Sequence, residues 1–405
     1  MVNIAVLGYG TVGSGVVEVI RTNGAIINEK AGEQVNIKYV LDLRDFPGDP
    51  VENILVHDFD TILNDPEVKV VVEVMGGVNP AYTFVKNCLL NGKSVCTSNK
   101  ELVAKHGPEL LQIAKDKNVN FRFEASVGGG IPIIRPLQTS ITADKVETIL
   151  GILNGTTNYI LTQMADEGWD FDKALKTAQE LGYAERNPEA DIEGYDACRK
   201  IAILSSLVAG KYVNFEDIYT EGISKITPED IKYAAKMGRA IKLLASAKWV
   251  DDNLFTMVAP FMVPTSHPLF GVNGVFNAIF LKGNVLGDAM FYGSGAGKLP
   301  TASAVVSDVV DLVKNRDKNI PIAWTDEQVK LSSVENANRQ FFVRVKGSKT
   351  DCIADIEKLF GNVETIELDD CEGEFGFVTE MMAECDFDKA FASIEGAVSR
   401  IRLEA

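Results

Sequence analysis

A glycine-rich segment near the first residue restricts the possible folds of this chain more than any other feature. Residues 3–7 form the apolar run NIAVL, and the GxGxxG motif Gly8-Tyr9-Gly10-Thr11-Val12-Gly13 follows at once. An apolar helical pattern then continues to Arg21. A buried strand, a glycine turn and a helix in this order are typical of the first unit of a parallel α/β sheet.

The rest of the chain predicts three parts. Strand-like runs at 36–41, 68–74, 94–97 and 119–123 alternate with helical patterns, which predicts a Rossmann-type parallel sheet with right-handed crossovers. After residue 130 the pattern is mixed, with strand-like stretches at 146–153, 254–263 and 278–281 and helical patterns at 159–181 and 195–208. From residue 339 the order strand-helix-strand-strand-helix-strand predicts a small ferredoxin-like domain. We therefore expect an α/β protein with an α+β middle domain.

The glycine motif also predicts a ligand. Gly8 permits a tight turn, Gly10 lets the backbone approach a pyrophosphate, and Gly13 lets the helix pack closely on the strand. The second strand continues into Asp42 and Arg44. A carboxylate here would accept hydrogen bonds from the adenine ribose of NAD, whereas a guanidinium would pair with the 2′-phosphate of NADP. The sequence predicts a dinucleotide cofactor and leaves NAD and NADP open.

Composition excludes several classes of function. The 405 residues carry a formal net charge of -17, which argues against nucleic acid or an acidic membrane surface as a partner. Six scattered cysteines without a CxxC pair indicate a reduced, cytoplasmic location, and no stretch predicts a signal peptide or membrane helix. The three histidines lack metal-ligand spacing, which argues against a catalytic zinc dehydrogenase. We interpret Cys198 as a core thiol.

The remaining candidates for catalytic residues are lysines. The segment 182–200, GYAERNPEADIEGYDACRK, places Asp196 and Lys200 one helical turn apart on an apolar helix, where desolvation lowers a lysine pKa. The alternative is an ion pair that reaches water. Lys100 and Glu124 each follow a predicted strand, at the sheet edge where α/β proteins bind ligands. In the NGTTN segment, Thr156 or its neighbour either caps a helix or presents amides to a substrate carboxylate.

With these segments in view, the chain resembles the homoserine dehydrogenase family, in its bacterial form with a C-terminal ACT-like domain. The resemblance rests on four segments besides the glycine motif: TSNKE (97–101), EASVGGGIPII (124–134), GILNGTTNYI (151–160) and residues 182–200. It implies reversible reduction of L-aspartate 4-semialdehyde to L-homoserine with NADPH or NADH, in threonine, methionine and isoleucine biosynthesis. It further implies a homodimer or higher homo-oligomer and a bound sodium ion.

The resemblance also implies residue roles. Lys200 and Lys100 would be catalytic, and the substrate would be bound by Glu185, Asp196, Asp191 and Thr156. We expect cofactor contacts from the whole glycine motif and from Arg44, Ser98, Lys100, Gly182 and Gly297. The sodium ligands would be Glu124, Val127, Gly129 and Ile131. The expected domains are a dinucleotide-binding domain at 1–133 closed by a helix near 300–318, a substrate-binding and dimerisation domain at 134–320, and an ACT-like domain at 338–405.

Two alternatives to this function stay open. The chain could be another Rossmann amino-acid dehydrogenase, or a catalytically silent dinucleotide sensor. The C-terminal domain also departs from the ACT pattern, because KGSKTDC at 346–352 replaces the Asp-x-Pro-Gly turn that holds an amino-acid effector. A role in packing or oligomerisation is therefore an alternative to regulation by threonine.

Overall fold

The computed structural model describes residues 1–405, and the chain divides into two compact units. The first unit comprises Met1–Asp144, Ala202–Glu216 and Phe291–Val329, and the second comprises Lys145–Ile201, Asp217–Met290 and Lys330–Ala405. No helix is both long enough and apolar enough to cross a membrane.

The first unit is built around a parallel six-stranded sheet in the order β3-β2-β1-β4-β5-β6. This is the strand order of doubly wound dinucleotide-binding folds, with the topological switch between β1 and β4. The Rossmann prediction is therefore confirmed. The strands are β1 (Val2–Leu7), β2 (Val35–Leu41), β3 (Leu55–Val56), β4 (Val68–Glu73), β5 (Ser94–Thr97) and β6 (Phe121–Arg122).

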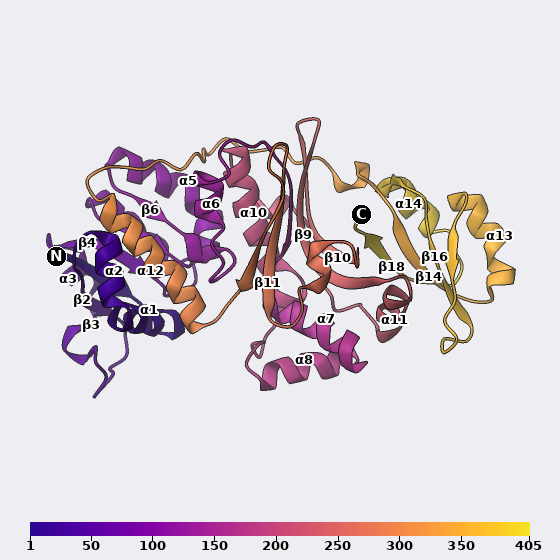
Figure 1. Ribbon diagram of the computed structural model, residues 1–405, viewed down its shortest axis with the longest axis horizontal. Helices are drawn as coiled ribbons and strands as arrows, with labels where there is room; N and C mark the ends of the chain where they lie inside the picture. Colours follow the sequence, from indigo (N-terminus) through magenta and orange to yellow (C-terminus); the bar gives the residue numbers. More distant parts are fainter. The chain divides into compact units, whose positions relative to one another are not determined.

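Helices cover both faces of this sheet (Figure 1). The helices α1 (Thr11–Thr22), α2 (Gly24–Ala31) and α12 (Lys298–Lys314) share one apolar core with the sheet, in which side chains such as Val16, Val70 and Val305 are fully or almost fully buried. The helices α4 (Ala81–Leu90) and α5 (Lys100–Asp116) pack on β4, β5 and β6, and the short α3 (Phe59–Leu63) contacts α4. The helix expected near 300–318 thus packs on the sheet from a distant part of the chain.

The second unit contains most of a ten-stranded sheet in the order β12-β11-β7-β9-β10-β18-β14-β16-β15, with β8 also paired to β10. The long antiparallel pair β9 and β10 forms its centre. Residues between them, Asp251 and Asp252, have positive φ angles of 48° and 66°, which makes the turn tight. The strands here are β7 (Val146–Ile152), β8 (Tyr219–Thr220), β9 (Arg239–Val250), β10 (Asn253–Pro264), β11 (Phe276–Gly283) and β12 (Gly287–Ser294).

Five helices accompany these strands: α7 (Gly155–Glu167), α8 (Phe171–Glu180), α9 (Glu189–Ile192), α10 (Tyr195–Ala209) and α11 (Pro228–Lys236). The stretch 159–181, for which the sequence predicts helical structure, contains most of α7 and all of α8. Gly168 ends α7 in the left-handed conformation, with φ 64°, and Asp170 then caps α8 through the backbone amide of Lys173. The expectation missed β9 and β12.

The C-terminal residues follow the expected strand-helix-strand-strand-helix-strand order. The elements are β14 (Phe341–Lys346), α13 (Lys349–Phe360), β15 (Glu364–Ile366), β16 (Glu374–Val378), α14 (Glu384–Phe391) and β18 (Ala397–Leu403), with a short β17 (Met382–Ala383) paired to β13 (Asn338–Arg339). Their sheet order is β18-β14-β16-β15. Stacked phenylalanines such as Phe341 and Phe387, 3.7 Å apart between ring centroids, fill the core between sheet and helices.

Candidate active site

The glycine motif forms the turn between β1 and α1. Gly8 has φ +96°, and a Cβ on Gly13 would lie 1.9 Å from the carbonyl oxygen of Gly8. Both positions therefore require glycine. A Cβ on Gly10 would meet no atom within 4 Å, so this face of the turn is open, and Gly10 is the N-cap of α1 without a side-chain cap. The open backbone at a helix N-terminus suits a pyrophosphate.

Asp42 and Arg44, which the sequence offers as alternative contacts to the adenine ribose of NAD or the 2′-phosphate of NADP, form an ion pair with each other. The Asp42 carboxylate accepts hydrogen bonds from the amide of Tyr9 at 2.8 Å and from Nε of Arg44 at 2.9 Å. Arg44 Nη2 donates to the other carboxylate oxygen at 3.1 Å. The hydrogen bonds from Arg44 hold the pKa of Asp42 well below its usual range. The Arg44 side chain is 62% exposed, and its guanidinium lies 5.1 Å from the ring centroid of Phe46.

Lys100 is the first residue of α5, directly after the carboxyl end of β5, as the sequence predicted. Asn99 caps this helix by accepting from the amide of Leu102, and its own side-chain amide donates to the Gly77 carbonyl at 2.5 Å. The amide of Ser98 donates to the Glu73 carbonyl at 3.3 Å. These contacts fix the turn that carries Ser98 and Lys100 at the edge of the sheet.

Glu124 organises the glycine-rich loop through its side chain. Its carboxylate accepts from the backbone amides of Ile133, Ile134 and Arg135 at 2.6–2.8 Å. The Glu124 amide in turn donates to Asp308, whose pKa burial raises to about 7. Because both carboxylate oxygens are engaged by amides, a metal ion would meet the backbone carbonyl of Glu124 rather than its side chain.

In the second unit, a compact polar cluster surrounds Lys200. Its Nζ donates to Oδ2 of Asp196 at 2.7 Å and to the carbonyl of Leu153 at 2.6 Å. The side chains of Lys200 and Asp196 are only 10% and 4% exposed. The alternative of an ion pair that reaches water is therefore wrong, because this ammonium is buried among oxygens. A buried pair of this kind responds strongly to the charge of a bound molecule.

Asn154 connects this pair to Asp191, a role that the sequence did not indicate. Its Nδ2 donates to Asp196 at 2.9 Å and to Asp191 at 2.7 Å, while its Oδ1 accepts from the amide of Thr157 and caps α7. The capping role expected for Thr156 or Thr157 thus belongs to Asn154. An Asn before an apolar helix was a signal for the cap. Nothing in the sequence indicated the two carboxylates 37 and 42 residues away.

The other expected substrate residues lie around this cluster or apart from it. The Thr156 hydroxyl donates to the Tyr183 carbonyl at 2.6 Å, which ties the start of α7 to the turn after Gly182. Gly182 has φ +76°. The side chain of Glu185 is exposed, and only its carbonyl is engaged, by Nε2 of Gln179. Gly297, the N-cap of α12 in the first unit, has φ +115°.

Cys198 has no nucleophilic character. It is 4% exposed, and burial raises its thiol pKa. The interpretation as a core thiol is confirmed. The doubly wound sheet with its open glycine turn, together with a buried lysine–carboxylate pair, defines a dinucleotide-dependent oxidoreductase.

Comparisons with known proteins give the particular family. A family model described as homoserine dehydrogenase, NAD binding domain, matches residues 8–124, and one described as homoserine dehydrogenase matches residues 132–310. The homoserine dehydrogenase of Synechocystis sp. is 42% identical over 351 residues, which cover 85% of this chain and 79% of that protein. The solved homoserine dehydrogenase of Thiobacillus denitrificans is 36% identical with a TM-score of 0.91, covering 100% of this chain and 98% of that chain.

A hyperthermophilic archaeal homoserine dehydrogenase in complex with NADPH is also similar, at 27% identity and a TM-score of 0.66 over 80% of this chain and 99% of that one. The chain belongs to the homoserine dehydrogenase family. It is an NAD(P)-dependent oxidoreductase that acts on a CH–OH group.

Proposed function

We propose that L-homoserine and L-aspartate 4-semialdehyde are interconverted beside the Asp196–Lys200 pair, with Lys200 as the acid–base group. The observation that carries this proposal is the burial of the Lys200 ammonium between Asp196 and the Leu153 carbonyl. Hydride transfer to an aldehyde leaves negative charge on its oxygen, and an ammonium both stabilises that charge and donates the proton. The cofactor supplies the hydride when bound.

The remaining site residues take supporting roles in this proposal. Asp191 and Asp196, joined by Asn154, form an acidic surface for the substrate ammonium. Glu185, exposed on its loop, and Thr156 would complete substrate binding. Lys100 and Ser98, at the carboxyl edge of the sheet, and Gly182 and Gly297 would contact the cofactor. The same reaction would place the protein in threonine, methionine and isoleucine biosynthesis in the cytoplasm.

The test is a steady-state assay of the full chain. We expect oxidation of L-homoserine with NADP or NAD, and reduction of L-aspartate 4-semialdehyde in reverse. Another amino-acid dehydrogenase would instead prefer a different member of a substrate panel. A silent sensor would bind the dinucleotide in a fluorescence titration without turning over any of them.

We further propose that NADP is the preferred cofactor. Both carboxylate oxygens of Asp42 are engaged by Tyr9 and Arg44, which leaves this acid poorly placed to accept from a ribose hydroxyl. The exposed Arg44 guanidinium can meet a 2′-phosphate instead.

Arg44→Ala should therefore raise the KM for NADPH by about 10- to 100-fold, the loss of one charge-assisted contact, and leave the KM for NADH within about twofold. Arg21→Ala is the matched control, because Arg21 is exposed and donates only to the Pro50 carbonyl. Equal changes in the KM values for NADPH and NADH would show that Arg44 maintains the shape of the turn and does not bind the 2′-phosphate.

A sodium site at the glycine-rich loop fits the residues present. The backbone carbonyls of Glu124, Val127, Gly129 and Ile131 lie on a loop in which Gly128 and Gly129 have φ angles of 73° and 56°. A Cβ on Gly129 would be 2.3 Å from the Gly295 carbonyl, so only glycine allows this path. Carbonyl oxygens suit a hard cation. We propose that sodium, when bound, fixes this loop and takes no part in the chemistry.

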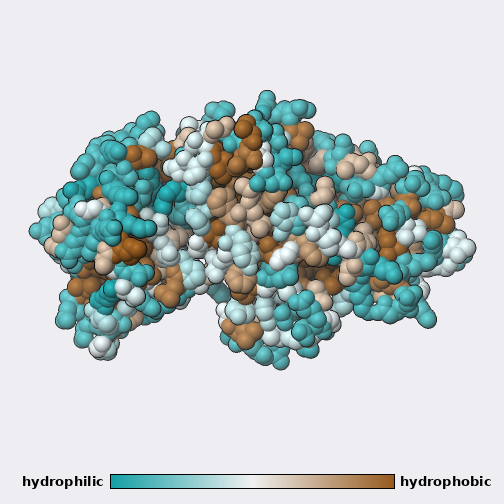
Figure 2. All heavy atoms as spheres, in the orientation of Figure 1, coloured by the Kyte–Doolittle hydropathy of each residue, from teal (hydrophilic) through white to brown (hydrophobic).

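We also propose a homodimer formed through the β11–β12 hairpin. β12 is the terminal strand of its sheet, and Figure 2 shows hydrophobic atoms gathered over this hairpin. At its turn Val285 and Leu286 are 76% and 53% exposed. An edge strand with an apolar surface favours association with an identical edge.

Leu286→Lys should shift the protein toward monomer in sedimentation velocity at micromolar concentration, because it places a charge in the apolar contact. Lys282→Ala, at an exposed position of β11, serves as the control. An unchanged sedimentation coefficient in Leu286→Lys would exclude this face as the interface.

A further inference from the structure

His57 has no role in the proposed reaction, yet it lies at the edge of the sheet that carries Arg44. It directly follows β3, which pairs in parallel with β2. The amide of Asp42 donates to the Val56 carbonyl at 3.3 Å, so the two strands end side by side. Ligands of doubly wound sheets bind outside the carboxyl ends of the strands. His57 is therefore next to the segment 42–45, where the adenine ribose of a dinucleotide is expected.

Both ring nitrogens of His57 face oxygen atoms that only accept hydrogen bonds. Nδ1 lies 2.7 Å from the backbone carbonyl oxygen of Asp42, and Nε2 lies 3.1 Å from Oδ1 of Asp45. A neutral imidazole has one N–H and can donate to only one of these oxygens, whereas the imidazolium donates to both. The geometry thus selects the positively charged form of His57.

The surroundings of His57 also favour its charge. The hydrogen bond to the Asp42 carbonyl has the largest effect and raises the pKa of His57 above its ordinary value, and the charges of Asp45 and Asp42 act in the same direction. The other carboxylates of these segments are held elsewhere, Asp49 by the Tyr9 hydroxyl, Glu52 by the Gly48 amide and Asp58 by the Asp60 amide.

The charge on His57 decides the charge balance of this turn. Arg44 is paired with Asp42, so these two side chains offset each other. Asp45 is 85% exposed and is offset by His57 only while the imidazole is protonated. A 2′-phosphate carries nearly two negative charges above its second pKa of about 6. An Asp45 carboxylate without its partner would repel such a group.

We propose that His57 is a specificity-determining residue that makes the preference for NADPH over NADH depend on pH. The imidazolium offsets Asp45 and admits the 2′-phosphate beside Arg44, and the neutral imidazole leaves Asp45 to repel it. NADH has an uncharged hydroxyl at this position and does not respond. The inference rests on the proposed binding of the 2′-phosphate at this turn. The competing interpretation is that His57 only holds the segment 42–45 in place.

The experiment measures the dissociation constants of NADPH and NADH by fluorescence titration of the full chain at pH 7, 8 and 9 and constant low ionic strength. In this range the phosphate stays a dianion and arginine stays charged. The NADPH constant divided by the NADH constant should rise at least about threefold from pH 7 to pH 9, the size of one exposed charge pair. The quotient removes pH effects that both cofactors share. A constant quotient would overturn the proposal.

Two substitutions separate the charge of His57 from its hydrogen bonds. His57→Gln keeps a side-chain N–H for the Asp42 carbonyl but has no charge, so its quotient at pH 7 should equal that of the unaltered protein at pH 9 and should not change with pH. His57→Lys stays charged throughout, with an ordinary pKa of about 10.4, and should keep the low quotient at pH 9. Equal weakening of NADPH and NADH in both variants would show that His57 only holds the turn.

His106→Gln is the matched control, because this histidine lies on α5, stacked on Tyr82, and burial lowers its pKa. Its quotient should follow that of the unaltered protein at each pH. Arg44→Ala distinguishes the two proposals for this turn. If it weakens NADPH binding while the quotient of the unaltered protein is constant with pH, the phosphate site stands and the role of His57 is refuted. If the quotient follows His57 while Arg44→Ala has no effect, the role of His57 stands and the contact of Arg44 is refuted.

Discussion

Lys200→Ala should reduce kcat by about 10³-fold, within the range of 10²- to 10⁴-fold that general acid–base groups supply. The corresponding rise in the activation barrier is about 4 kcal/mol. The physical reason is that Lys200 is the buried cation of the cluster, held by Asp196 and the Leu153 carbonyl. Without it, no acid–base group at this position exchanges the proton of the substrate oxygen, which is removed in homoserine oxidation and added in semialdehyde reduction.

The measurement is kcat for homoserine oxidation, together with the dissociation constant of NADPH from fluorescence titration. The dinucleotide affinity should stay within about twofold, because the glycine turn is unaltered. Lys200→Arg separates the two functions of the lysine, since an arginine keeps the charge but does not release its proton. We expect it to remain about as inactive as Lys200→Ala.

Lys176→Ala provides the control, because Lys176 lies on the exposed face of α8 and only contacts Glu180 at 4.0 Å. Turnover close to that of the unaltered protein in Lys200→Ala would assign the proton transfer to another group. Partial recovery of Lys200→Ala by added ethylamine would support the acid–base role further, because a free amine can replace the missing one.

The parts of the fold that local patterns determine were the parts that the sequence predicted well. Four of residues 68–73 are valines, and the glycine motif needs a strand before it and a helix after it, so the sequence predicted the Rossmann sheet. β9 was missed because Lys242 interrupts its apolar run. The structure buries that lysine against the Val272 carbonyl and Asn273, and burial lowers its pKa to about 8.

In the candidate site, too, the sequence predicted the features that depend on local spacing and not those that depend on contacts between distant elements. Asp196 and Lys200 were paired from their spacing on one helix, which is a local property. Asn154 could not be found, because its contacts with Asp191 and Asp196 depend on how α7, α9 and α10 come together. The sequence likewise could not decide whether Asp42 or Arg44 is available to contact the cofactor. The answer depends on which atoms of these two neighbouring side chains bind each other.

The second large effect is a loss of unfolding free energy on substitution of Arg402, whose side chain is 1% exposed. It donates to Glu384 through Nε and Nη2 and to Glu221 through Nη1 at 2.7 Å. Although burial opposes it, the charge and hydrogen bonding of Arg402 hold the pKa of Glu221 below its usual value. Arg402→Met would leave two carboxylates without their main partner, which costs about 3–5 kcal/mol of unfolding free energy for a buried pair.

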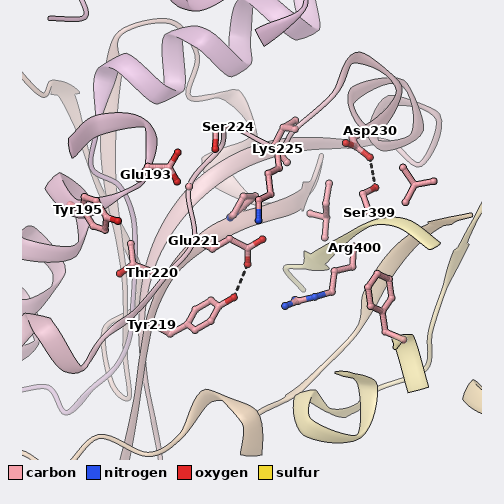
Figure 3. Close-up of a pocket in the computed structure, with 16 residues that line it drawn as sticks. Glu193, Tyr195, Tyr219, Thr220, Glu221, Ser224, Lys225, Asp230, Ser399 and Arg400 are labelled. Atoms are coloured by element: carbon pink, nitrogen blue, oxygen red, sulfur yellow. Dashed lines mark hydrogen bonds between the residues drawn. The ribbon is translucent and has the colours of Figure 1, made fainter. Parts of the chain in front are cut away.

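The pH dependence of this loss gives a sharper test than its size. In the unaltered protein, Glu221 stabilises the fold above its unfolded pKa and loses that contribution as the pH falls. In Arg402→Met, burial is the largest remaining influence on the pKa of Glu221 and raises it, against the smaller lowering effects of Arg400 and the Tyr219 hydroxyl (Figure 3), so the folded state takes up protons as the pH falls. The deficit measured by urea unfolding should therefore be largest at pH 7 and smaller at pH 5.

Lys358→Met is the control, because its pair with Asp355 is about three-quarters exposed on both sides, at 75% and 77%. Its unfolding free energy should stay within about 0.5 kcal/mol of the unaltered value at both pH values. A deficit in Arg402→Met that is equally large at pH 5 and pH 7 would show that the arginine stabilises the fold by packing its aliphatic stem. Its charge would then contribute little, and β18 would be joined to the unit chiefly by apolar contacts.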